Sequence, residues 1–350
     1  MADLDYLLEN VAIATVADVM DLTEENRILV KQGLEMLKRT SNLGLRALIQ
    51  CIGLEGKKIQ AYHIGFILAP CLNASGKLDT AKRALALLRA KTEREADMLA
   101  GDLKALNESR RDMTDRVVDE AMAKVEQTDI RGDKVLVIYL PDCHESLAGL
   151  VAGRVRENYY RPVFVLTDSE DGVKGSGRSI ESYSMYEELT GCGDLLTKFG
   201  GHPMAAGLSL DKENVEKFKR RLNDQCTLSE EELTEKVVID MELPFAAITE
   251  QFIEELEYME PFGKGNTKPV FAARGVVMQH VKIIGKNKNV AKATAIDAAG
   301  NRMEAICFHD AQEFAERCER NNGKMSITFY PGINEFRGER KIQIVITHYR

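Results

Sequence analysis

The sequence lacks a long apolar run and a basic, apolar leader. No hydrophobic stretch reaches the ~18–20 residues that a membrane-spanning helix needs. The first ten residues, MADLDYLLEN, contain no lysine or arginine and do not resemble a signal peptide. These absences argue against a membrane span, and they predict a cytoplasmic protein.

Paired cysteines are also missing. The seven cysteines are dispersed over 350 residues, and no two of them have Cys-x-x-Cys spacing. An odd and scattered set argues against a disulfide framework and against a structural zinc site. No internal repeat or low-complexity segment is evident. Hydrophobic residues make up 44% and charged residues 29% of the chain, which is the composition of an ordinary globular protein with two or three domains.

Charge is distributed unevenly. The formal net charge is −8, yet residues 261–350 carry 15 lysines and arginines against eight acidic residues, which leaves −15 on residues 1–260. A basic C-terminal part on an acidic body predicts a polyanionic partner, because binding follows local potential rather than total charge.

The sequence of the first half of the chain predicts helices. Residues 1–78 are rich in Ala, Leu, Met and Glu, and only CLNASGKL at 71–78 is typical of a loop. Residues 79–127 contain no proline and have helical apolar spacing, so they predict one long connector helix. Gly101 marks the candidate break in that helix.

The second half predicts an α/β domain followed by a β barrel. Within 128–230, two β-branched runs flank a crossover helix at 144–159, and a second helix is expected at 184–200. Within 235–350, five or six short strand-like runs and one helix predict a closed barrel, for which the OB fold is the best match. The predicted fold class is α/β plus β barrel.

The stretch KGSGRSI, at 174–180, combines glycines with a hydroxyl and a guanidinium. Accessible backbone amides beside Ser176 and Arg178 suit a phosphate or a carboxylate. The alternative is an ordinary glycine-rich turn between a strand and a helix that carries a solvated arginine.

A second such stretch is KFGGHPMAAGLSL, at 198–210. Gly200 and Gly201 can adopt φ values closed to other residues, and His202 can donate to a phosphate oxygen or act as an acid–base. The alternative is a structural turn before a strand near 207–210. Two phosphate-suited stretches in one domain are more informative together than either is alone.

Three further positions are candidates with open alternatives. Asp18 lies on an apolar helical stretch, where an acid tends to be paired, to cap the helix or to bind a cation. Asn73 and Lys77 belong to a small-residue loop that suits a phosphate contact or an ordinary turn. His144 and Ser146 mark a helix start, as capping residues or as functional groups.

The C-terminal part contains a lysine-rich hairpin with aromatic residues nearby. Lysines on a hairpin beside stacking faces are typical of barrels that bind single strands. The alternative is a solvated lysine hairpin over core aromatics. The lysines are Lys282, Lys286, Lys288 and Lys292, and the aromatics are Phe271, Phe308, Phe329, Tyr330 and Phe336.

In sequence order, six stretches resemble landmarks of the RecJ family in the DHH phosphoesterase superfamily, and the resemblance covers essentially the whole chain. They are ATVADVMDLTEENRILVKQGL, LAPCLNASGKLDTA, CHESLAGLVAGR, KGSGRSI, KFGGHPMAAGLSL and EPFGKGNTKPVF. The resemblance implies that 1–78 is the remainder of a DHH catalytic domain, that 79–127 is the connector helix, and that a DHH-associated domain (128–230) and an OB domain (235–350) follow.

The resemblance also implies an activity. Members of the family are single-stranded-DNA-specific 5′→3′ exonucleases of DNA repair and recombination, with two Mn²⁺ or Mg²⁺ ions. Asp18 matches a metal-binding catalytic aspartate, and His202 would contact the scissile phosphate. The implied phosphate and nucleic-acid contacts are Ser176, Gly177, Arg178, Ser179, Gly200, Gly201, Asn73, Lys77, Lys282, Lys286 and Lys288.

Two departures from the family pattern stand out. The Asp-His-His motif and an aligned Asp-x-Asp stretch are absent, so we expect a C-terminal fragment that lacks most metal ligands and is inactive alone. The family motif Arg-x-Asn-Ala-x-Gly-Arg reads Cys71-Leu-Asn-Ala-Ser-Gly-Lys77 here, and lysine lacks the bidentate fork of arginine.

The expected partner is single-stranded DNA with a 5′ end, and the family implies a single-strand-binding protein and a helicase as protein partners of a monomer. Two alternatives remain open: a single-strand-binding module without catalysis, and a DHH-family phosphodiesterase that acts on short oligonucleotides. The barrel disfavours the second alternative.

Overall fold

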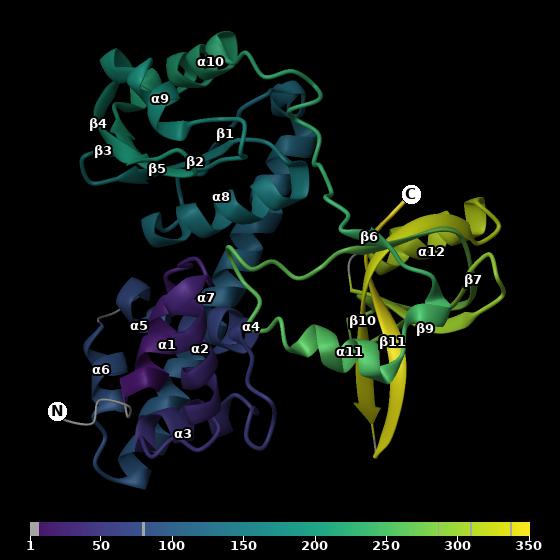
Figure 1. Cartoon of the computed structure of the whole chain (residues 1–350). Coiled ribbons are helices and arrows are strands. Elements are labelled where there is room, and N and C mark those ends of the chain that lie inside the picture. Colours follow the sequence, from purple (N-terminus) through teal and green to yellow (C-terminus); the bar gives the residue numbers. More distant parts are fainter. Residues whose placement is uncertain (1–6, 79–80, 286, 309, 337) are drawn as a thin grey trace. The chain divides into compact units, whose positions relative to one another are not determined.

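The computed structural model describes residues 7–78, 81–285, 287–308, 310–336 and 338–350. The chain forms two compact units, and Figure 1 shows their elements. One unit contains residues 1–39, 57–66 and 237–350, and the other contains residues 40–56 and 67–236. Among the described residues, none of the helices combines the length and the apolar character that crossing a bilayer requires.

The unit of 40–56 and 67–236 begins with four helices. They are α3 (Leu43–Cys51), α5 (Ala69–Leu78), α6 (Lys82–Leu88) and α7 (Glu93–Gln127). Side-chain caps start two of them, since Asn42 accepts from Leu45 N at 3.0 Å and Thr92 accepts from Glu95 N at 3.2 Å.

Two of the helix predictions are wrong in detail. The connector is not broken at Gly101, which lies inside α7 with no atom near its missing side chain; the interruption comes at 89–92, where Thr92 caps a new helix. The stretch at 71–78 is not a loop but part of α5. Cys71 and Ala74 are buried on its inner side, so packing overrides the weak helix propensity of Ser and Gly there.

A five-stranded mixed sheet follows in the order β1-β2-β3-β5-β4. The strands are β1 (Leu136–Tyr139), β2 (Val163–Ser169), β3 (Gly172–Arg178), β4 (Leu196–His202) and β5 (Ala205–Leu210). Only β1 and β2 are parallel, joined by the predicted crossover helix α8 (Glu145–Tyr159), and the other pairs are antiparallel.

Helices cover both faces of this sheet (Figure 1). On one face Phe164 packs edge-to-face on Phe218 of α10 (Val215–Gln225), beside α9 (Met185–Thr190). On the other face Val163 and Val165 join a cluster with α8 and the C-terminal half of α7. The alternation of β2 side chains between two apolar layers explains its uninterrupted hydrophobic sequence.

The glycine-rich stretches differ from their predicted form. KGSGRSI is not a turn between strand and helix, because residues 174–178 lie in β3. The helix expected at 184–200 ends at Thr190, and residues 196–202 form β4, which pairs with β5 in a hairpin. Small residues alternate with larger ones in these strands. On the core side of the sheet, large neighbouring side chains occupy the space that a side chain at the small positions would fill.

The unit of 1–39, 57–66 and 237–350 contains α1 (Leu8–Ala17), α2 (Glu24–Leu37) and the short α4 (Ala61–His63), which a π-helical turn at Ile64–Leu68 follows. Its α11 (Glu250–Glu257) has its C-terminal end against α2. Arg27 donates to the carbonyls of Tyr258 and Met259 at 3.1 Å, which satisfies acceptors that a helix end leaves free.

The rest of this unit is the predicted β barrel. Its strands are β6 (Met241–Glu242), β7 (Phe271–Ile284), β8 (Val290–Ile296), β9 (Arg302–Cys307), β10 (Lys324–Phe336) and β11 (Glu339–Tyr349), with α12 (Ala311–Arg320) between β9 and β10. The order is β10-β11-β9-β8-β7-β6, and pairing of β10 with β7 closes a five-stranded barrel.

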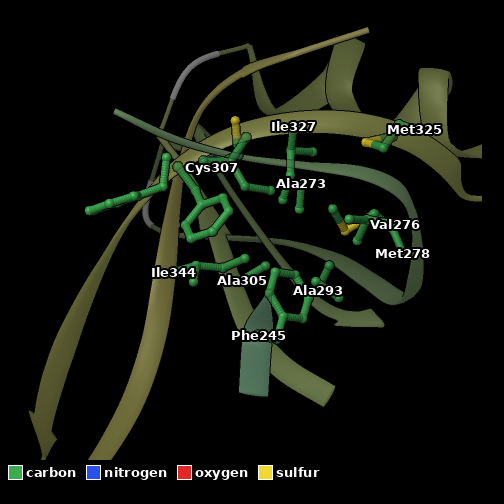
Figure 2. Close-up of a cluster of buried hydrophobic side chains, with 14 of the residues drawn as sticks. Phe245, Ala273, Val276, Met278, Ala293, Ala305, Cys307, Met325, Ile327 and Ile344 are labelled. Atoms are coloured by element: carbon green, nitrogen blue, oxygen red, sulfur yellow. The ribbon is translucent and has the colours of Figure 1, made fainter. Parts of the chain in front are cut away.

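Figure 2 shows the barrel interior. Small side chains such as Ala273, Ala293 and Ala305 pack in one cluster with large ones such as Phe245 and Ile344, which fills the narrow interior of the closed sheet. The OB-type fold predicted for this region is confirmed.

Candidate phosphate and nucleic-acid site

Three neighbouring strands place the candidate phosphate residues on one face of the α/β sheet. Backbone pairing aligns β3, β5 and β4 in three rows, and residues opposite one another in a row point to the same side. We call this set the cation-lined face. Its rows are Lys174–Ser209–Lys198, Ser176–Gly207–Gly200 and Arg178–Ala205–His202.

The cation-lined face has charged residues at its edges and small residues along its middle. Lys174 and Lys198 are exposed, and Gly200 and Gly207 leave open space above the backbone. The outer strands β3 and β4 are about 10 Å apart, since adjacent strands lie roughly 4.8 Å apart. An anion at the middle of this face therefore has Lys174 and Ser176 on one side and Lys198 on the other.

The glycines between these residues have a different role from the one predicted. A side chain at Gly177 would lie 2.7 Å from Phe164 Cε1 and 2.8 Å from Met185 Sδ, and one at Gly175 would lie 2.4 Å from Leu166 Cδ2. Both glycines face the core, and β3 pairs with a strand on each side. Gly177 is therefore a packing residue rather than an amide donor to phosphate.

The Arg178 side chain lies against Gly149 of α8. Its Nη1 donates to Gly177 O at 2.8 Å, and a side chain at Gly149 would come within 2.8 Å of its Nη2. Burial, and secondarily the positive charge of Arg156, lower the pKa of the Arg178 guanidinium. A half-buried guanidinium with no carboxylate partner among the described residues is suited to an anion.

A hollow of about 530 Å³ lies over the first two rows. Its walls include Ser176 and Lys198 from the sheet and Glu145 and Ser146 from the start of α8. Lys174 donates to Glu145 at 2.7 Å, and this bond lowers the pKa of the Glu145 carboxyl. The positive end of the α8 dipole adds to the attraction for an anion.

Sequence reasoning missed Lys174, Lys198 and Ser209 as members of this face. The signal was a two-residue alternation of polar and small residues in KGSGR, KFGGH and AAGLS, which becomes informative once these stretches are recognised as strands. His144 caps α8, because its side chain accepts a hydrogen bond from Ser146 N at 3.3 Å. This is the capping role, which was one of the two alternatives predicted for His144.

Two other predicted phosphate contacts are structural. Ser179 is buried, and its hydroxyl donates to Tyr183 O at 2.5 Å, so it is not available to a ligand. Gly201 has φ +152, and a side chain there would lie 2.4 Å from Ala205 O, so it serves the tight β4–β5 hairpin. His202, at the end of the same strand, is exposed and shares the row of Arg178.

Asp18 lies at the end of α1 and is exposed rather than buried in an apolar stretch. The burial argument for a bound cation therefore does not hold. Across the part of the chain that the structure describes, no three His, Cys, Asp or Glu side chains gather into a possible metal site. Divalent ions such as Mg²⁺ need several oxygen ligands, so Asp18 alone does not form one.

Asn73 lies exposed on α5, not in a loop. Lys77 is on the same helix, but its side chain lies outside the described residues. Lys286 in the barrel hairpin also lies outside them.

The barrel presents a basic hollow of about 270 Å³ on β7, β8 and β9. Lys282 is directly opposite Lys292 across β7 and β8, and like charges in such a pair repel. Glu304 neutralises Lys292 at 2.8 Å, which leaves Lys282 as exposed positive charge beside His280 and Arg302. Lys288 is exposed in the hairpin beyond.

The predicted stacking aromatics are mostly core residues. Phe271 and Phe329 are 3% and 0% exposed, and Tyr330 is half-buried under the Lys268 ammonium, 3.7 Å from its ring centre. Phe308 is 52% exposed and remains available for stacking on a base. The Phe336 side chain lies outside the described ones.

Replacing Lys282 by alanine is expected to weaken binding of a single-stranded oligonucleotide about three- to tenfold near 0.1 M salt. Losing one phosphate contact also reduces the slope of log affinity against log salt by about 0.7. Fluorescence anisotropy at four salt concentrations measures both quantities. Lys324→Ala, an exposed lysine outside the hollow, is the matched control; equal slopes for the two variants would remove Lys282 from the interface.

Comparison with known proteins shows which families the domains of this chain resemble. A family model described as the DHHA1 domain matches residues 132–228, and one described as the RecJ OB domain matches residues 239–348. The "Single-stranded-DNA-specific exonuclease RecJ" of Bacillus subtilis (strain 168) is 36% identical over 346 residues, 98% of this chain and 44% of that protein.

The chain belongs to the RecJ family. The RecJ exonuclease of Escherichia coli (strain K12) is 33% identical over 356 residues, 98% of this chain and 61% of that protein. The crystal structure of Thermus thermophilus RecJ with Mg²⁺ matches 99% of this chain and 52% of its own, with a TM-score of 0.82 and 26% identity. The chain thus spans about half the length of these RecJ relatives.

Proposed function

We propose that this chain binds single-stranded DNA and supplies the DHHA1 and OB domains of a metal-dependent 5′→3′ exonuclease of DNA repair and recombination. The observation that supports it most is the common orientation of Ser176, Arg178, Lys198 and His202 on the cation-lined face. The RecJ relatives are named single-stranded-DNA-specific exonucleases, which agrees with this assignment.

In this proposal each residue of the face has a chemical role. The Arg178 guanidinium forms a bidentate pair with a 5′-terminal phosphate, and the Ser176 hydroxyl donates to the same group. His202 donates to the neighbouring scissile phosphate from the same row of the sheet. Gly200 allows the phosphate to approach the backbone, because it has no side chain.

The proposed domain extents are those expected from the sequence: 1–78, 79–127, 128–230 and 235–350. Asn73 and Lys77 in the first domain, and Lys282, Lys286 and Lys288 in the last, are proposed to contact the nucleic acid. A single-strand-binding protein and a helicase as partners, and a monomeric state, remain predictions.

A divalent metal belongs to the proposed activity. RecJ of Thermus thermophilus has been solved with Mg²⁺ and with Mn²⁺. Asp18 offers one carboxylate, and the described residues do not add the further ligands that such an ion needs. We therefore derive no catalytic step through a metal, and the proposed roles above concern binding and orientation of the strand.

A second candidate is a single-strand-binding module without catalysis, which the lack of a described metal cluster favours. A phosphodiesterase for short oligonucleotides is less favoured, because the OB barrel adds a binding surface for a longer strand.

Incubating the chain with 5′-phosphorylated single-stranded DNA and Mn²⁺ separates the candidates. Release of mononucleotides that EDTA abolishes supports the exonuclease, whereas binding without release supports the binding module. Absence of both binding and release contradicts both candidates.

A further inference from the structure

Arg110, in the middle of α7, is a half-buried cation without a counter-ion. Its Nη2 donates to Asn107 Oδ1 at 2.8 Å, and its Nε is buried with no hydrogen-bond partner. Among the described residues no carboxylate lies within ion-pair distance of it. The nearby Glu108 pairs with Lys104 instead, at 3.8 Å. An unpaired charge removed from water is costly unless a ligand compensates it.

Further positive charge gathers at the same place. Arg111 follows on α7, and Arg154 comes from α8, which packs on α7 through an apolar cluster. Burial first, and then the charge of Arg111 and Arg154, lower the pKa of Arg110. Arg111 and Arg154 are exposed, so the cluster is open to solvent on one side.

The surroundings fix the orientation of Arg110. Asn107 is buried, donates to Cys71 Sγ on α5 at 3.5 Å, and accepts from Arg110, so α5 and α7 together hold the guanidinium. A pre-oriented fork with unused donors matches the oxygens of a phosphate group.

We propose that Arg110 and Arg154, with Arg111 at the rim, form a second anion site that binds a phosphate group. The site is separate from the cation-lined face, because neither Arg178 nor Ser176 contributes to it. Phosphate of a nucleic-acid backbone and free phosphate share this chemistry. That the phosphate belongs to single-stranded DNA rests on the proposed function; the anion site itself does not.

The test compares wild type with Arg110→Gln, Arg154→Gln and the double variant, using a 5′-hydroxyl oligodeoxythymidine that lacks a terminal phosphate. Glutamine retains a donor for Asn107 and removes the charge. We expect the double variant to bind about tenfold more weakly, as charge-assisted hydrogen bonds imply. Its slope of log affinity against log salt should fall by about 0.7. Arg94→Gln, an exposed arginine on the same helix, is the matched control.

A second measurement separates a ligand site from a structural role. Inorganic phosphate should raise the melting temperature of wild type and of Arg94→Gln more than that of the double variant, which keeps only the cation-lined face as a phosphate site. Without phosphate the double variant should melt no lower than wild type, because the repulsion between the charges of Arg110 and Arg154 is gone. Lower melting with unchanged DNA binding and an unchanged phosphate response would overturn the site.

The outcomes also distinguish this inference from the proposed function. If wild type binds no single-stranded DNA yet gains stability from phosphate through Arg110, the anion site stands and the proposed function fails. If wild type binds DNA and every variant binds with the same affinity and salt slope, the inference fails and the proposed function stands.

Discussion

Replacing Arg178 by alanine is expected to weaken binding of a 5′-phosphorylated single-stranded oligonucleotide by about 10- to 100-fold. The substitution removes charge-assisted hydrogen bonds worth about 1.5–3 kcal/mol. The guanidinium lies over Gly149, half-buried and without a carboxylate partner in the described chain, so its donors remain available to a phosphate. Anisotropy titrations with labelled oligonucleotide measure the change.

The 5′-hydroxyl form of the same oligonucleotide is the ligand control for Arg178→Ala, and its affinity should change much less. Arg220→Ala, a solvent-facing arginine of α10, is the protein control. Arg178→Lys should fall between wild type and alanine, because lysine keeps the charge without the fork. An equal loss for both forms of the oligonucleotide would show that Arg178 does not recognise the terminal phosphate.

Replacing Gly177 by valine is expected to destabilise the α/β domain by about 3 kcal/mol, at the upper end of overpacking costs. The first atom of the new side chain would already lie 2.7 Å from Phe164 and 2.8 Å from Met185. The ring of Phe164 is itself locked against Phe218 in a closed cluster, so it has little room to move. The melting temperature of the compact unit that contains this domain, residues 40–56 and 67–236, should fall by roughly 6–12 °C, as expected for a unit of that size.

Gly200→Ala is the control for this prediction. Gly200 is on the same sheet, but no atom lies within 4 Å of the position its side chain would occupy. Its melting temperature should remain within about 2 °C of wild type. If Gly177→Val melts at the same temperature as Gly200→Ala, Gly177 has no packing role. The first interpretation of KGSGRSI, in which its backbone amides bind a phosphate, would then be favoured.

The sequence predicted the fold class well because apolar periodicity is strong in most elements. The β-branched runs at β1 and β2, the helical spacing in α7 and the short alternating strands of the barrel each match one regular structure. The OB fold and the α/β domain were found from these patterns together with the family resemblance.

The small residues at the site misled the same reasoning. Glycine and alanine usually indicate turns, yet in β3, β4 and β5 they are strand residues, because Phe164, Leu166 and other core side chains occupy the space beside them. The local sequence does not show which distant side chains pack beside a glycine in the folded chain. The misassignment of 174–178 as a turn therefore concealed Lys174 and Lys198 as neighbours of Ser176 and Arg178.

Arg178 and His202 were selected as candidates by their chemistry alone, and their roles stay predictions. Arg178 and His202 do fall in one row, although their alignment depends on strand pairing that no local motif contains. Arg110 was missed altogether. Its environment arises from α5, α7 and α8 meeting in the folded chain, and a lone arginine in a helix rich in charged residues carries no signal in the sequence.

Titrating the wild-type chain with one oligonucleotide in three forms tests the central claim most directly. The forms are the 5′-phosphorylated single strand, the 5′-hydroxyl single strand and the blunt duplex, all measured at the same salt concentration. A phosphate site on the cation-lined face together with a single-strand-binding barrel predicts the tightest binding for the phosphorylated single strand, about tenfold weaker binding for the hydroxyl form, and the weakest for the duplex. Equal affinity for all three forms, or preference for the duplex, would contradict it.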